Sequence, residues 1–286
     1  MSTVADTEMA ARIQAVRARI QTAEQRFGRE PGSVRLLAVS KRQPLEKIIA
    51  ARAAGLRAFG ESYAQEGVDK QQLLAALEGQ RLVSAGAQAA GSQGSESQGD
   101  ESLVAGAESS GLGGAGPDLR KEDSTSIHKV IEWHFIGRVQ SNKTRLIAEH
   151  FDWVHGISSV EHARRLAAQR PAERGPLHVC LQVNLSGEAS KAGVAPDALE
   201  ELLHEVAGMD GLLLEGFMTL PAPAEEFSAQ RRPFAALRAL RDRYAGEGLA
   251  LPMLSMGMSQ DLEAAIAEGA TMVRIGTALF GERDQV

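Results

Sequence analysis

The sequence contains one cysteine, no long apolar run and no cluster of basic residues. Cys180 is the only cysteine among 286 residues, so no disulfide can form within the chain, and a reducing compartment fits this usage. No stretch approaches the ~20 apolar residues that a membrane-spanning helix needs, and Arg12 and Arg17 interrupt the apolar core that a signal peptide requires. A formal charge of −6 without a Lys/Arg stripe argues against nucleic-acid binding. These absences predict a cytoplasmic protein that binds neither membranes nor nucleic acid.

From residue 34 onward, short apolar strands alternate with amphipathic helices. The predicted strands are 34–40, 57–61, 132–137, 152–157, 177–184, 212–219, 251–255 and 272–276. The predicted helices between them are 44–54, 63–78, 141–149, 159–169, 196–208, 225–245 and 259–268. Consecutive βα units give a parallel sheet, and eight of them favour a closed (β/α)8 TIM barrel. An open doubly wound sheet is the alternative, because strand order cannot be read from sequence.

Two segments lie outside this alternation of strands and helices. Residues 4–27 predict an additional N-terminal helix, with one apolar face that packs on the same domain and consists of Met9, Ile13, Val16, Ile20 and Phe27. Residues 84–126 contain nine glycines, nine serines and no aromatic residue, which predicts a disordered insertion. The remaining 243 residues match the ~250 of one barrel, so residues 1–286 are expected to form a single domain. The insertion follows a helix and precedes a strand, which places it on the N-terminal face, away from the expected site.

Lys41 stands at the end of the first predicted strand, after the apolar run Leu36-Leu37-Ala38-Val39. Barrel enzymes and binding proteins place their chemistry at the C-terminal ends of the strands. If Lys41 points inward, the alternation of a strand also points Leu37 and Val39 inward, so the lysine rises from an apolar layer. Such burial lowers the pKa of a lysine and supplies the neutral amine that an aldehyde needs. A lysine that extends to solvent from a strand end is the plainer interpretation.

Two loops near the C-terminus are suited to a phosphate. The segment Ser255-Met256-Gly257-Met258-Ser259 leads into a predicted helix that Ser259 would cap. Gly276 and Thr277 follow the last predicted strand and offer backbone N–H groups and a hydroxyl. Loops after the seventh and eighth strands commonly bind phosphate in barrels. A lysine opposite a phosphate site predicts pyridoxal phosphate (PLP), held as a Schiff base on Lys41.

Arg274 lies in an otherwise apolar strand, where an arginine needs a partner. It either pairs with a carboxylate such as Glu61 or faces the pyridine nitrogen of PLP. A positive charge beside that nitrogen disfavours its protonation and weakens the ring as an electron sink. His134 fits a hydrogen-bonded core histidine better than an acid or base. Lys143 and Lys191 rival Lys41 but lie in polar surroundings, and the histidines lack the spacing of metal ligands, so we expect no metal.

These segments strongly resemble the pyridoxal phosphate homeostasis proteins, single PLP-binding barrels similar to the N-terminal domain of alanine racemase. The matching segments are 38–41, 59–63, 133–143, 181–184, 218–219, 254–259 and 272–283. The resemblance implies that Lys41 carries PLP as a Schiff base, that Ser255, Gly257, Gly276 and Thr277 hold its phosphate, and that Arg274 faces the ring nitrogen. Ser62 departs from the family, which usually has asparagine there.

The resemblance also implies a carrier or buffer in vitamin B6 and amino-acid homeostasis, without an established reaction. Apo-enzymes that need PLP are the expected partners, and a monomer is the expected state. The alternative is a PLP-dependent amino-acid racemase, which needs proton donors on both faces of the ring. Barrel racemases take one of these from an additional β domain, which we do not expect here, and Tyr63 is the one tyrosine that could reach the site. A Schiff-base aldolase acting on a sugar phosphate is a third, weaker hypothesis.

Overall fold

The computed structural model describes residues 4–91, 131–186 and 192–282. The chain divides into two compact units: residues 1–71 together with 131–286, and residues 72–130. The first unit contains all eight strands, which form a closed parallel barrel in the order β1 to β8. Pairing of β1 with β8 closes the ring and aligns Leu37 with Arg274. The prediction of a TIM barrel is therefore confirmed, and the open sheet is excluded.

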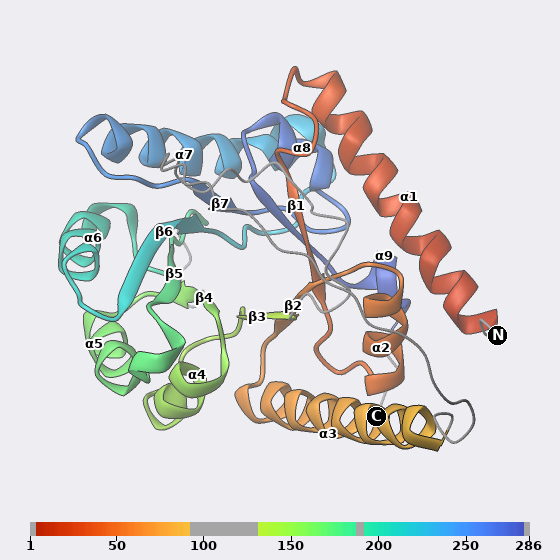
Figure 1. Ribbon diagram of the computed structural model, residues 1–286. Coiled ribbons are helices and arrows are strands. Elements are labelled where there is room, and N and C mark those ends of the chain that lie inside the picture. The colour runs from red at the N-terminus through yellow and green to blue at the C-terminus, as the bar shows by residue number, and fades with distance from the viewer. Residues whose placement is uncertain (1–3, 92–130, 187–191, 283–286) are drawn as a thin grey trace, which may run out of the picture. The chain divides into compact units, whose positions relative to one another are not determined.

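The strands of the barrel are short and are each followed by a helix or helical turn (Figure 1). They are β1 (Arg35–Val39), β2 (Ala58–Glu61), β3 (Glu132–Phe135), β4 (Trp153–Ile157), β5 (Leu177–Gln182), β6 (Leu212–Met218), β7 (Met253–Ser255) and β8 (Met272–Ile275). The α-helices are α1 (Val4–Arg26), α2 (Leu45–Ala53), α3 (Ala64–Gly91), α4 (Thr144–His150), α5 (Val160–Gln169), α6 (Leu199–Ala207), α7 (Phe227–Gly246), α8 (Leu262–Ala267) and α9 (Thr277–Phe280). The described residues also form three 3-10 turns: η1 (Ser141–Lys143), η2 (Ala172–Arg174) and η3 (Pro196–Ala198).

The barrel interior is filled by one inward-facing side chain from most strands. This apolar cluster consists of Leu37, Ala58, Trp153, Cys180, Met218, Met253 and Met272. Burial raises the pKa of the Cys180 thiol far above its ordinary value, so the only cysteine is an inert core residue. Polar side chains lie on the same inner surface at neighbouring positions, among them His134, His155, Ser255 and Arg274, which are all buried. The interior thus combines an apolar cluster with a set of buried polar side chains.

Helix α1 packs outside the barrel against α2, α8 and α9. Its apolar face is buried as the sequence predicts, with Ile13, Val16 and Ile20 each at most 5% exposed. Phe27, just beyond the helix, stacks on Phe227 with the ring centroids 6.0 Å apart. The prediction that this helix packs on its own domain is confirmed.

Two predicted boundaries are wrong. Helix α3 continues to Gly91, so residues 84–91 of the expected disordered insertion are helical, because alanines there favour a helix. The rest of that insertion, 92–126, lies outside the described residues. Helix α8 begins at Leu262 with Asp261 as its N-cap, not at Ser259. The carboxylate of Asp261 accepts a hydrogen bond from the backbone N–H of Met258, which holds residues 258–261 in a turn before the helix.

Within the described ranges, no helix is long and apolar enough to cross a membrane.

Candidate functional site

A cavity of about 530 Å³ opens at the C-terminal ends of the strands. This volume lies in the range of small-molecule sites, roughly 300–1,000 Å³. Its wall combines charged side chains, two glycine- or serine-containing loops and an apolar lip. The residues that line it are Val39, Lys41, Ile136, Leu220, Pro221, Pro223, Ala224, Gln230, Met258, Ser259, Gln260, Asp261, Arg274, Gly276, Thr277 and Ala278. Of these residues the sequence analysis named Lys41, Arg274, Gly276 and Thr277 as site residues, but neither Asp261 nor the apolar lip of 220–224.

Lys41 lines this cavity directly after β1. The expected alternation holds, because Leu37 belongs to the interior cluster while Val39 and Lys41 face the cavity above it. The backbone turns sharply at this point: the N–H of Gln43 donates to the carbonyl of Ser40 over 3.0 Å. Arg42 within this turn has a φ of 56°, in the left-handed region that side chains other than glycine rarely adopt. The lysine therefore stands on a tight turn at the mouth of the barrel.

Arg274 lies at the floor of the cavity and is 4% exposed. Its guanidinium donates to the carbonyl and hydroxyl oxygens of Ser255 and to the carbonyl of Thr219, the last over 2.8 Å. Burial lowers its pKa to about 10, so it remains a cation at neutral pH. Glu61 is not its partner, because that carboxylate accepts hydrogen bonds from Ser40 and Lys70 on the outer side of the barrel wall. The alternative of an Arg274–Glu61 ion pair is therefore wrong.

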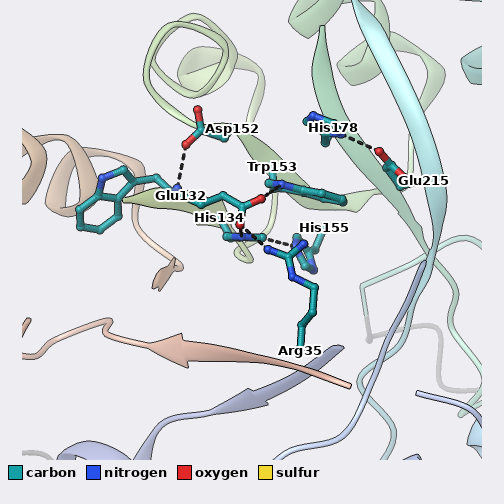
Figure 2. A network of polar contacts seen from close by, with 9 residues as sticks. Arg35, Glu132, His134, Asp152, Trp153, His155, His178 and Glu215 are labelled. Atoms are coloured by element: carbon teal, nitrogen blue, oxygen red, sulfur yellow. Dashed lines mark hydrogen bonds and ion pairs between the residues drawn. The ribbon is translucent and has the colours of Figure 1, made fainter. Parts of the chain in front are cut away.

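A chain of polar contacts runs from Arg274 through the barrel interior. The hydroxyl of Ser255 lies 2.8 Å from Nδ1 of His155, whose Nε2 lies 2.9 Å from Nδ1 of His134. Figure 2 shows the far end of this chain, where His134 faces Glu132 and Glu132 is paired with Arg35. His134 thus has the hydrogen-bonded core position that the sequence favoured.

The charged groups at the two ends of this series of contacts favour one direction for the hydrogen bonds in it. Nε2 of His134 lies 3.5 Å from the Glu132 carboxylate and makes no hydrogen bond among the described residues, but the nearby anion favours the tautomer with its hydrogen on Nε2, in which Nδ1 accepts from His155. Nδ1 of His155 then accepts from the Ser255 hydroxyl, and Ser255 accepts from Arg274, which can only donate. Burial lowers the pKa of both histidines, which keeps them neutral as this scheme requires.

The same contacts keep Glu132, at the far end of this series of polar contacts, negatively charged. Burial favours the neutral form of Glu132, but His134 and the Arg35 guanidinium outweigh it and hold the pKa of this carboxyl at about 2. Trp153 donates its indole N–H to the same carboxylate. Glu132 is therefore an anion, and the polar contacts lead from the buried cation Arg274 to a partly exposed anion.

The predicted phosphate residues fall into two groups. Gly276 and Thr277 line the cavity, together with Ser259, which the sequence treated only as a helix cap. Ser255 and Gly257 are buried behind that wall. The hydroxyl of Ser255 is engaged by His155 and Arg274, and the carbonyl of Gly257 accepts the backbone N–H of Arg274 over 2.9 Å. The structure thus places these two residues in contact with Arg274 and not at the cavity surface.

Asp261 is the one carboxylate among the described residues that line the cavity. Burial raises its pKa, against the hydrogen bond from Met258 and the charge of Arg274. Lys41 and Arg274 thus face a single acidic group, so the wall favours an anionic ligand.

Other residues considered from the sequence lie elsewhere. Neither Tyr63 nor Tyr244 lines the cavity: Tyr63 accepts a hydrogen bond from Arg42, and Tyr244 packs against Phe217. Lys143 is outside the cavity wall, and Lys191 lies outside the described residues. Among the residues that are described, no group of three or more His, Cys, Asp or Glu side chains could hold a metal.

Comparison with known proteins gives one family. The alanine racemase N-terminal domain matches residues 12–284. The chain is 45% identical to a pyridoxal phosphate homeostasis protein of Pseudomonas aeruginosa over 99% of this chain and 97% of the relative. It is 41% identical to the protein of the same name from Escherichia coli K12, over 94% of each chain.

Solved structures agree with these matches. PipY of Synechococcus elongatus with PLP bound has a TM-score of 0.69 at 29% identity. The match covers 96% of this chain and 100% of the PipY chain. An unknown protein from Bifidobacterium adolescentis has a TM-score of 0.75 at 32% identity, covering 98% and 97%. An alanine racemase of Clostridium difficile shares only the fold: its TM-score is 0.62 at 11% identity, over 98% of this chain and 58% of that one. The chain belongs to the pyridoxal phosphate homeostasis protein family, whose barrel is that of the alanine racemase N-terminal domain.

Proposed function

We propose that this protein binds PLP as a Schiff base on Lys41 and acts as a carrier or buffer of the cofactor in vitamin B6 and amino-acid homeostasis. The observation that carries the proposal is the shared cavity: Lys41, Arg274, Gly276 and Thr277 all line it. The structure of the relative PipY with PLP bound supports the choice of ligand, and the match between the two proteins covers the whole PipY chain.

The donors in the cavity fit this cofactor. A lysine amine can condense with an aldehyde and lose water, and hydrolysis reverses the bond without any oxidant. Gly276 and Thr277 supply backbone N–H groups and a hydroxyl for a phosphate, and Ser259 lies on the same wall. In this account Ser255 and Gly257 act behind the wall by holding Arg274. The cofactor supplies an electrophilic aldehyde when bound, while the protein supplies the amine, the anion site and the shape.

The charge of Arg274 supports the choice of a carrier over a racemase in this proposal. A guanidinium that faces the ring nitrogen keeps it unprotonated, which weakens the electron sink that racemisation needs. The absence of both tyrosines from the described cavity wall leaves Tyr63 no role as a proton donor there. We therefore propose binding and delivery to apo-enzymes, by a monomer, in place of catalysis.

The test is a visible absorption spectrum of the purified protein with PLP, beside a Lys41→Ala control. We expect an absorption band of the bound cofactor in the wild type that is missing from the control. A band that survives in Lys41→Ala would overturn Lys41 as the anchor. Incubation of the same sample with L-alanine tests the alternative, because formation of the D-isomer would show a racemase.

A further inference from the structure

A cluster of charged residues lies behind Lys41, on the outer side of the barrel wall. Lys70 of α3 is 7% exposed and Glu61 of β2 is fully buried, and Nζ of Lys70 lies 2.8 Å from Oε1 of Glu61. The same ammonium donates to Glu66 over 2.7 Å and to the backbone carbonyl of Ser40 over 2.8 Å. All three acceptors are oxygens, so every N–H of the buried ammonium is used.

The contacts of this cluster reach the backbone on both sides of Lys41. Lys70 holds the carbonyl of Ser40, which belongs to the peptide unit before Lys41. Glu66 accepts the N–H of Arg42, which belongs to the peptide unit after Lys41. Peptide units are planar, so the orientation of the two units that flank a residue sets its φ and ψ and hence the direction of its Cα–Cβ bond. The cluster thus determines where the Lys41 side chain starts.

The same cluster stabilises a strained turn. Arg42 is the one residue other than glycine with a positive φ in the described ranges, at 56°. Such a conformation persists only where surrounding contacts hold it. The backbone N–H of Arg42 donates to Glu66, and the guanidinium of Arg42 donates to the hydroxyl of Tyr63 over 3.0 Å. Glu61 completes the arrangement by accepting from the Ser40 hydroxyl over 2.6 Å.

The buried ion pair of Glu61 and Lys70 costs free energy that apolar packing at the same positions would avoid. Oε2 of Glu61 is buried and has no hydrogen-bond partner among the described residues, and burial raises the pKa of this carboxyl. Apolar residues of similar volume often stabilise such positions better than a buried ion pair does. What the charged residues provide, and apolar residues could not, is a hydrogen bond to each peptide unit beside Lys41: Lys70 binds the Ser40 carbonyl and Glu66 binds the Arg42 N–H.

We propose that Lys70, held by Glu61 and Glu66, is a positioning residue for Lys41 that directs its amine into the cofactor cavity. The proposal rests on the proposed function of Lys41. Lys70 does not touch the cavity and acts only through the backbone of the turn. Its loss should therefore slow attachment of PLP without removing the amine that reacts.

The test uses full-length protein, PLP and borohydride, which reduces a Schiff base to a stable adduct on the lysine. The variants are Lys70→Met and Glu61→Gln/Lys70→Met; the double variant removes the unpaired buried charge that could otherwise unfold the protein. A third, Glu66→Ala, alters a partly exposed position and releases the Arg42 N–H. For each, the thermal midpoint without PLP, the PLP affinity and the rate of adduct formation on Lys41 at saturating PLP are measured.

The matched control is Glu24→Gln, at the opposite end of β1. Glu24 is 2% exposed and holds the loop before this strand through the N–H groups of Gly32 and Val34, at 3.0 and 2.9 Å. Like Glu66 in the cluster behind Lys41, Glu24 is a carboxylate that accepts hydrogen bonds from backbone N–H groups, but it does so at the other end of β1. We expect this variant to lower the thermal midpoint and to form the adduct as the wild type does.

We expect adduct formation or PLP affinity to fall by about tenfold or more in the folded Lys70 and Glu66 variants, the size of a lost charged hydrogen bond. A folded double variant that forms the adduct within about twofold of the wild type would overturn the positioning role. If the wild type itself forms no adduct on Lys41, the proposed function is wrong and this role is lost with it. The two failures are thus distinguished by the wild-type sample.

Discussion

Replacing Gly257 by alanine tests how closely the loop after β7 is packed behind the cavity. Gly257 has a φ of +95°, and a Cβ added there would lie 2.6 Å from Cβ of Ala265 and 3.3 Å from Cγ1 of Val273. The left-handed conformation costs about 1–2 kcal/mol for a residue with a side chain. Forcing a methyl group into a packed core costs about 1–3 kcal/mol more. We therefore expect Gly257→Ala to lower the free energy of unfolding by about 2–5 kcal/mol.

Gly248 provides the matched control for this variant. Its φ is +97°, but an added Cβ would meet nothing within 4 Å, so Gly248→Ala should cost only the conformational part. Urea unfolding of both variants without PLP measures the difference. Because the Gly257 carbonyl accepts the N–H of Arg274, PLP retention should fall in Gly257→Ala alone. Equal destabilisation by the two substitutions would refute the close approach of Gly257 to α8.

Three further predictions concern the interior chain, the cavity floor and the insertion. Burial holds the pKa of His155 well below its ordinary 6.5, so unfolding takes up a proton and stability should fall as the pH drops below that value. His155→Asn should flatten this dependence in urea unfolding by up to about 1.4 kcal/mol per pH unit, and an unchanged slope would contradict the burial of a neutral ring. Arg274→Met should weaken PLP binding by about tenfold or more in a titration, since a buried charged contact is lost; unchanged affinity would place Arg274 away from the cofactor. Deletion of residues 92–126 should leave the thermal midpoint and PLP binding intact, because the barrel unit consists of 1–71 and 131–286, and loss of either would show that the insertion supports the barrel.

The fold could be predicted because its signals are local and repeated. Eight apolar runs separated by amphipathic segments indicate a barrel, and the alternation within β1 places Leu37, Val39 and Lys41 on the inner surface. Helix boundaries could not be predicted where a side chain binds the backbone just before the helix. Asp261 binds the N–H of Met258 and delays the start of α8, and nothing in the spacing of Ser259 and Glu263 indicates this.

The long-range partners of charged residues could not be predicted. Sequence identified Glu61 as a possible partner for Arg274, whereas the barrel places Glu61 on the outer side of the wall beside Lys70. Strand alternation does carry this information, because Ser40 and Glu61 occupy outward positions, but only once the register between β1 and β2 is known. The same holds for Ser255, whose hydroxyl faces His155 and not the cavity surface.

The most direct test of the account is to locate the PLP attachment site. The wild-type protein is incubated with PLP, reduced with borohydride, digested and analysed by mass spectrometry. The account predicts a single pyridoxyl group on the peptide that contains Lys41. A modification spread over surface lysines, or found on another lysine alone, would contradict the assignment of Lys41 and of the cavity around it.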